Sequence, residues 1–231
     1  MDILRLSPDG PARTTVAEAY GAPLSDPAEH HQRTGRPYVA LTMIASLDGS
    51  TAIDRKSTPL PNDTDAAVLH QARSLADVIL IGAATVRIGG YSKASRPGQR
   101  IAVVSSSLDL DLDAAPFATG DGFLVTTNDA AVPPGIDVVR AGSRRVDIGR
   151  AIEGLGARGF DHVSAEGGSR LNGAVLDAGA PDELNLTLSP RLVGGDGPRL
   201  TRGAAISDHR LELAAMFVDD ESFVFSRWRK R

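Results

Sequence analysis

The stretch "FDHVSAEGGSRLNGAVL", Phe160 to Leu176, runs from a short apolar strand into a helical pattern, with Gly167 and Gly168 at the junction. The same order of strand and helix recurs in "DVILIGAATV", Asp77 to Val86. Repeated units of this kind predict an α/β fold with a mostly parallel central sheet flanked by helices. The junction itself is either a tight turn or a cradle for a phosphate, because a helix N-terminus presents free N–H groups.

Further strands and a closing hairpin complete this α/β pattern. The run "YVALTMIAS", Tyr38 to Ser46, is nearly apolar throughout, as expected for a central strand that is buried on both faces. Near the end of the chain, "HRLELAAMFVDDESFVFSRW", His209 to Trp228, predicts an antiparallel hairpin that turns at "DDES". The fold class is therefore α/β with antiparallel strands at one edge.

Residues 1–36 are expected to form an N-terminal extension, and residues 37–231 the main domain. Within the extension, "TTVAEAY" predicts a short helix whose capping box joins Thr15 and Glu18. The polar, proline-rich stretch that follows predicts an extended lead-in to the domain.

Composition excludes several classes of function. The chain has 231 residues, a net charge of -4 and no cysteine, which rules out disulfides and a thiolate nucleophile. The five histidines form no HExxH motif, so no metal site is expected. The acidic balance gives no sign of a partner among nucleic acids or anionic membranes. With no signal-peptide core and no apolar run of roughly 20 residues, a cytoplasmic location is expected.

Ligands of parallel α/β sheets bind beyond the carboxyl ends of the strands. That rule directs attention to the segments that follow Ser46, Gly82, Val104 and Glu166. Small side chains near Ala45 would let a flat ring lie close, whereas Asp48 is most simply a turn residue. Thr85 and the cluster around Ser106 supply hydroxyl groups, the latter suited to the 2′-phosphate of NADPH. Singly, each feature is also explained by a turn or a cap; in combination they favour a dinucleotide site.

Five blocks of the sequence occur in the order found in one known family: "RPYVALTMIASLDG", "LHQARSLADVILIGAATVR", "VVSSSL", "SAEGGSRLNGAVLDAG" and "DELNLTLSPRLVGG". By these blocks the chain resembles the riboflavin-biosynthesis pyrimidine reductases of the RibD C-terminal-domain family, whose fold is similar to dihydrofolate reductase. The resemblance covers about Arg36 to Trp228, so it implies that residues 37–231 form the reductase domain.

The resemblance also implies which residues bind each ligand. Counting the junction glycines, NADPH is expected along Ala45, Pro59, Gly82, Thr85, Ser106, Gly167, Gly168, Ser169, Arg170, Leu171 and Asn172. The substrate is expected to meet Ser57, Arg73, Arg96 and Glu166, with Glu166 also the expected catalytic residue. Guanidinium groups suit a phosphorylated substrate, and a carboxylate can accept hydrogen bonds from an amino-pyrimidine edge.

The implied reaction is an NADPH-dependent reduction of 5-amino-6-(5-phosphoribosylamino)uracil to its ribitylamino form, with hydride transfer to the sugar C1′. A homodimer is implied as well. Hydride chemistry belongs to the nicotinamide, and the protein contributes orientation and electrostatics.

Two departures from the family pattern keep alternatives open. The chain has Thr42 where a lysine is usual, and "RIGGYS", Arg87 to Ser92, where an acidic "DDP" is usual. An acidic group is therefore missing near Gly89, and either Asp54, Asp63 or Glu166 replaces it or the substrate differs. The alternatives are a reductase of another heterocycle, such as a dihydropteridine or dihydrofolate, and a non-catalytic nucleotide-binding protein.

Overall fold

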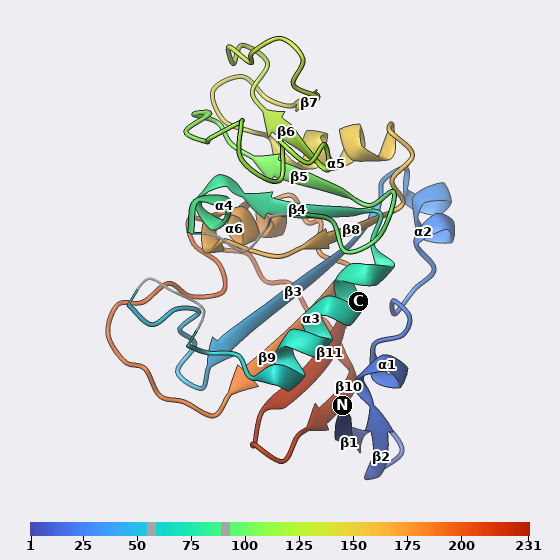
Figure 1. Ribbon diagram of the computed structural model, residues 1–231. Coiled ribbons are helices and arrows are strands. Elements are labelled where there is room, and N and C mark those ends of the chain that lie inside the picture. The colour runs from blue at the N-terminus through green and yellow to red at the C-terminus, as the bar shows by residue number, and fades with distance from the viewer. Residues whose placement is uncertain (55–58, 89–92) are drawn as a thin grey trace.

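A parallel β-sheet forms the centre of the computed structural model, which describes residues 1–54, 59–88 and 93–231 (Figure 1). Its parallel strands lie in the order β9 (Glu183–Ser189), β3 (Tyr38–Ser46), β8 (His162–Ala165), β4 (Val78–Gly82), β5 (Arg100–Val104), β6 (Gly122–Thr126) and β7 (Val138–Arg140). Strands β3 and β4 both pair with β8, so chain segments that lie far apart in sequence meet at the centre of the sheet.

Antiparallel strands extend the sheet beyond β9. They are β11 (Val224–Lys230), β10 (Leu211–Val218), β1 (Asp2–Ser7) and β2 (Ala12–Thr15), in that order. The β10–β11 hairpin turns at "DDES" with Val218 opposite Val224. The predicted fold class, a mostly parallel α/β sheet with a C-terminal antiparallel hairpin, is confirmed.

Helices cover both faces of the sheet. They are α1 (Val16–Ala19), α2 (Pro27–Thr34), α3 (Asp63–Leu75), α4 (Ala83–Ile88), α5 (Ile148–Gly156) and α6 (Ser169–Asp177). In Figure 1, α3 lies in front of β9 and β11, and α1 lies to the right of α3. In the described part of the chain, none of these helices has the length and apolar character needed to cross a membrane.

Strand β4 shows how the sequence produces the core. Val78 and Leu80 pack on one face, in the same cluster as side chains of α5 and α6, whereas Ile79 and Ile81 pack on the other. All four side chains are fully buried, as the near-continuous apolar run predicts. Burial of each such side chain contributes roughly 1.5–3 kcal/mol, so this strand anchors the layers that position the site.

Residues 1–36 add to the same sheet through β1, which pairs with β10. The capping box between Thr15 and Glu18 is confirmed at the start of α1. The expectation of an extended lead-in is wrong over residues 27–34, which form α2. Asp26 caps that helix by accepting a hydrogen bond from the Glu29 N–H, and Gly35 ends it with a φ of 74°. Proline in the first turn and glycine after the last are helix boundary signals.

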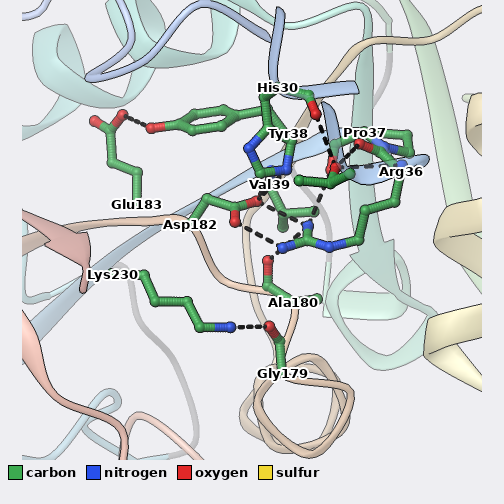
Figure 2. A network of polar contacts seen from close by, with 11 residues as sticks. His30, Arg36, Pro37, Tyr38, Val39, Gly179, Ala180, Asp182, Glu183 and Lys230 are labelled. Atoms are coloured by element: carbon green, nitrogen blue, oxygen red, sulfur yellow. Dashed lines mark hydrogen bonds and ion pairs between the residues drawn. The ribbon is translucent and has the colours of Figure 1, made fainter. Parts of the chain in front are cut away.

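A network of polar contacts holds this N-terminal region to the sheet (Figure 2). The Arg36 guanidinium donates to both carboxylate oxygens of Asp182, at 2.7 and 2.8 Å. The Tyr38 hydroxyl donates to Glu183 at 2.8 Å, and Glu183 also pairs with Arg227 at 2.7 Å. The start of β3 is thereby tied to the start of β9, which sets the relative position of the two strands.

Candidate active site

A cavity of about 1380 Å³ lies at the carboxyl ends of the parallel strands. Gly82 at the end of β4, Val104 at the end of β5 and Glu166 after β8 all line it, as do Thr42, Met43 and Ile44 of β3. Most of the sequence-predicted strand ends therefore meet in one place, since parallel strands end at the same edge of a sheet. The volume suits a dinucleotide together with a second small molecule.

The N-terminus of α6 forms one wall of the cavity. Its capping residue, Gly168, has a φ of 31° and provides no side-chain hydrogen bond to the first turn. A Cβ atom on Gly168 would lie 3.4 Å from Oγ1 of Thr85, and one on Gly167 would lie 3.0 Å from the sulfur of Met43. The glycines bring backbone N–H groups close to Thr85 in a cradle that a side chain would fill. That arrangement fits a phosphate or pyrophosphate group.

Cations surround the same wall. Arg145, Arg170 and Arg202 line the cavity and are exposed, and within the described ranges none of them pairs with a carboxylate. Ser106 also lines the cavity, and its hydroxyl accepts a hydrogen bond from the Val146 N–H at 3.1 Å. Ser106 therefore positions the loop that carries Arg145. Guanidinium groups of this kind bind phosphates through paired hydrogen bonds.

Two predicted substrate residues, Arg73 and Glu166, form a tight ion pair. Arg73 Nε lies 3.0 Å from both carboxylate oxygens of Glu166, and Nη2 lies 2.5 Å from Oε2. Ser164 adds a hydroxyl hydrogen bond at 3.0 Å. The Glu166 side chain is 1% exposed and lines the cavity, whereas Arg73 lies behind it in α3. Arg73 thus orients Glu166 and does not itself form part of the wall.

Asp65 is a cavity residue that the sequence did not single out. It lies in the first turn of α3, is 9% exposed and lines the cavity. Burial raises the pKa of its carboxyl to about 6, against a smaller lowering by a hydrogen bond with the Thr187 hydroxyl. The spacing of residues along α3 could have indicated that Asp65 is buried, because Asp65, Val68 and Ala72 share the buried face of this helix. A carboxylate on that face faces the protein interior.

Several predicted residues are not brought to the cavity. Ala45 is 4% exposed within β3, opposite Leu188 of β9, and the wall is formed by its neighbours instead. Pro59 is exposed and does not line the cavity. Asn172 is buried and donates to the Leu200 carbonyl at 2.9 Å, so it holds a loop. Ser57 lies outside the described residues.

Arg96, which the resemblance implies to meet the substrate, does not line the cavity. Its guanidinium donates to the carbonyls of Ser74 and Ala76, at 3.0 and 2.9 Å. These carbonyls lie just before Val78, the first residue of β4. The cavity lies at the other end of this strand, where Gly82 lines it. Arg96 therefore closes the end of α3, and its expected contact with substrate stays a prediction.

The acidic residues expected to replace the missing acid near Gly89 also differ in whether they line the cavity. Asp54 and Asp63 are exposed and do not line the cavity, whereas Glu166 does. The segment around Gly89 lies outside the described residues. Among the described residues, no group of three or more His, Asp or Glu side chains could hold a metal ion. Asp65 and Glu166 are the buried carboxylates that line the cavity in the described part of the chain, whereas Asp147 and Asp177 line it as exposed side chains.

Asp48 acts as the turn residue that its sequence context indicates. Its carboxylate accepts hydrogen bonds from the N–H groups of Val193 and Gly194, at 3.1 and 2.7 Å. The Ser46 hydroxyl and these N–H groups hold the pKa of Asp48 at about 2. Asp48 thus fastens the glycine-rich loop, whose Pro198 lines the cavity.

Comparisons with known proteins show the family to which the chain belongs. The family model described as the RibD C-terminal domain matches residues 37–225. A 2,5-diamino-6-ribosylamino-4(3H)-pyrimidinone 5′-phosphate reductase from Methanothermobacter thermautotrophicus is 30% identical over 214 residues, which cover 82% of this chain and 96% of that protein. The riboflavin biosynthesis protein RibD of Bacillus amyloliquefaciens is 32% identical over 190 residues; they cover 75% of this chain and only 51% of that longer protein.

Solved structures show the same fold. A pyrimidine reductase-like protein from Corynebacterium diphtheriae has a TM-score of 0.79 at 22% identity, over 94% of this chain and 99% of that chain. A Thermotoga maritima deaminase/5-amino-6-(5-phosphoribosylamino)uracil reductase has a TM-score of 0.72 at 19% identity, over 88% of this chain and 59% of that chain. The family match over residues 37–225 confirms the resemblance found in the sequence: the chain belongs to the RibD C-terminal domain family, the pyrimidine reductases of riboflavin biosynthesis.

Proposed function

We propose that this chain reduces a ribosylamino-pyrimidine 5′-phosphate to its ribitylamino counterpart, with NADPH as the reductant. Family membership makes the chain an oxidoreductase of the riboflavin pathway and implies a nicotinamide cofactor. Relatives are named for two forms of the substrate, the 2,5-diamino-pyrimidinone and the deaminated uracil. One observation supports this function above all others: a single cavity has a phosphate cradle on one wall and two buried carboxylates elsewhere in its lining.

The residues present fit a nicotinamide dinucleotide. The cradle formed by Gly167, Gly168 and Thr85 would hold the pyrophosphate, and Ser106 with Arg145 would meet a 2′-phosphate. NADPH, when bound, supplies the hydride. The choice of NADPH over NADH rests on this cationic and hydroxyl-bearing wall, since a 2′-phosphate adds negative charge that an arginine can neutralise.

The substrate requires positioning and a controlled supply of protons. In the implied reaction, C1′ of the ring-opened, imine-like sugar gains a hydride and the attached nitrogen gains a proton, which leaves a ribitylamino group. Glu166, held by Arg73, presents a fixed carboxylate to the amino-pyrimidine. Ile44 and Leu69 add apolar surface to the cavity, which limits water around the reacting atoms.

Assembly and location complete the proposal. The homodimer and the cytoplasmic location expected from the sequence are retained as parts of it. Two relatives that match this chain over 96% and 95% of their own length are named as reductases of the 2,5-diamino-pyrimidinone phosphate.

The direct test supplies purified protein with NADPH and each of the two pyrimidine phosphates in turn. Loss of NADPH absorbance, together with a product that has gained two hydrogens by mass spectrometry, is the expected result. Oxidation only with a dihydropteridine or dihydrofolate would replace this function with the other-heterocycle alternative. Tight NADPH binding without oxidation by any of these compounds would indicate the non-catalytic alternative.

A further inference from the structure

Among the described residues, the carboxylate of Asp65 has no cationic partner that would explain its burial. The N-cap of α3 is supplied by Asn62, whose side chain accepts from the Asp65 N–H at 3.0 Å, so capping does not use the Asp65 carboxylate. Its hydrogen bond is with the Thr187 hydroxyl of β9. No Arg, Lys or His side chain in the described ranges forms an ion pair with it.

Burial of a carboxylate away from any cation is unfavourable, so such groups in cavities commonly serve a ligand. A carboxylate offers about four acceptor positions, and Thr187 occupies one of them. The cavity places Asp65 in the same lining as Ile44 and Leu69, which supply apolar surface for a flat ring. The remaining acceptor positions therefore suit a planar ligand with two adjacent N–H donors.

The two forms of the substrate differ at the edge of the pyrimidine ring to which a carboxylate would hydrogen-bond. The undeaminated ring carries a 2-amino group beside N3–H, which gives two parallel donors. The deaminated ring carries a carbonyl oxygen at position 2, so N3–H stands between two acceptors. A carboxylate satisfies the first edge with both oxygens, but against the second edge one of its oxygens faces a carbonyl oxygen. Leaving a buried acceptor against another acceptor is strongly unfavourable.

We propose that Asp65 is a substrate-binding residue that accepts hydrogen bonds from the 2-amino group and N3–H, and so selects 2,5-diamino-6-ribosylamino-4(3H)-pyrimidinone 5′-phosphate over its deaminated form. This inference rests on the proposed function and names the substrate of the same site. It differs from the sequence-based expectation of a deaminated uracil. It also assigns the chain to a reduction that precedes removal of the 2-amino group.

The test measures kcat/KM for both pyrimidine phosphates with NADPH, and equilibrium binding of each without cofactor. The wild-type chain is expected to prefer the 2-amino form by at least tenfold, mainly through KM. Asp65→Asn presents one acceptor and one donor, which match N3–H and the carbonyl at position 2, so it is expected to reverse the preference. Asp65→Ala is expected to bring the ratio of the two kcat/KM values, one for each pyrimidine phosphate, near one. Asp63→Asn, an exposed change two positions earlier in the same helix, is the control and is expected to keep the wild-type ratio.

The outcomes separate this inference from the proposed function. The inference fails if the wild-type chain turns over both compounds equally, or if Asp65→Asn retains the wild-type preference. Either result would mean that Asp65 does not hydrogen-bond the 2-amino group and N3–H, but the reductase function would stand. If the wild-type chain oxidises NADPH with neither compound, the proposed function itself fails.

Discussion

The Arg73 guanidinium holds the Glu166 carboxylate through Nε at 3.0 Å and Nη2 at 2.5 Å, and so joins helix α3 to the end of β8. Glu166 is 1% exposed and Arg73 is 17% exposed, so the pair is largely removed from solvent. Both residues match family positions expected to meet substrate, yet only Glu166 lines the cavity. The pair connects the packing of α3 to the geometry of the site.

Removal of one partner of this pair is expected to destabilise the fold. Arg73→Met removes a guanidinium that pairs with a buried carboxylate, and loss of one partner of such a pair costs about 3–5 kcal/mol. The double variant Arg73→Met with Glu166→Gln removes both charges and is expected to cost less than the sum of the single changes. Urea unfolding of the four proteins gives the coupling energy directly. Additive effects would contradict the role of Arg73 as the residue that orients Glu166.

An exposed pair provides the matched control. Arg100 and Asp137 are 32% and 43% exposed and lie 3.0 Å apart. Arg100→Met is expected to change the free energy of unfolding by no more than about 1 kcal/mol, because solvent already screens the interaction.

Gly168→Asp is expected to weaken NADPH binding at least tenfold, about 1.4 kcal/mol, because it places a carboxylate in the phosphate cradle. Fluorescence titration with NADPH measures the effect. Gly159→Asp is the control: its φ of 83° imposes a similar backbone strain, but Gly159 does not line the cavity. Equal losses of affinity in the two variants would show that the effect is strain and not contact with a phosphate.

Arg145→Ala is expected to lower affinity for NADPH by at least tenfold and to leave affinity for NADH nearly unchanged. A charge-assisted contact with the 2′-phosphate is worth about 1.5–3 kcal/mol, and NADH lacks that phosphate. Arg144→Ala, an exposed neighbour that does not line the cavity, should affect neither cofactor. If Arg145→Ala weakens both cofactors alike, the 2′-phosphate lies elsewhere.

A band of half-buried apolar side chains supports the expected homodimer. Leu188 lies opposite Val224, which lies opposite Val218, so the three share one face of β9, β11 and β10. Leu186 and Met216 lie on the same face, one row along. The opposite face of these strands packs against α1 and α3. We expect a dimeric mass by light scattering at micromolar concentration.

A charge in this band tests the interface. Leu186→Arg is expected to give a monomer, because an unpaired charge at an apolar interface is disfavoured. Leu192→Arg, at a loop position that is 80% exposed, should leave the mass unchanged. A monomeric wild-type mass would refute the dimer outright.

The sequence predicted most of the fold and part of the site, for a physical reason. Runs such as Val78 to Gly82 and the glycine junction at Gly168 are local signals, since burial of a strand and approach of a backbone leave a pattern in adjacent residues. The positions of Arg96 and Asp65 depend on contacts with distant segments. Arg96 resembles a phosphate ligand by sequence, yet it closes the end of α3. Asp65 resembles an ordinary first-turn acid, yet the register of β9 places Thr187 beside it.

Asp65 should make folding stability fall as pH rises. Its pKa is raised from 3.8 to about 6 in the folded chain, so between those values the folded form keeps a proton that the unfolded form releases. The resulting stability is fully present below about pH 4 and is lost as pH rises through about 6. A shift of this size corresponds to about 3 kcal/mol. Asp65→Asn removes the free-energy cost of burying an ionised carboxylate, so at about pH 8 the variant should unfold at a higher urea concentration than wild type.

The comparison across pH distinguishes this effect from general changes in packing. At about pH 4, where Asp65 is protonated in the folded chain, Asp65→Asn and wild type should have nearly equal free energies of unfolding. Asp63→Asn, which removes an exposed acid from the same helix turn, should instead be slightly less stable at about pH 8 because it loses a favourable interaction with the helix dipole. A variant that gains stability while losing preference for the 2-amino substrate would show that Asp65 is retained for binding at the expense of the fold. Equal stability of Asp65→Asn and wild type at both pH values would mean that the carboxylate is already well accommodated in the folded protein.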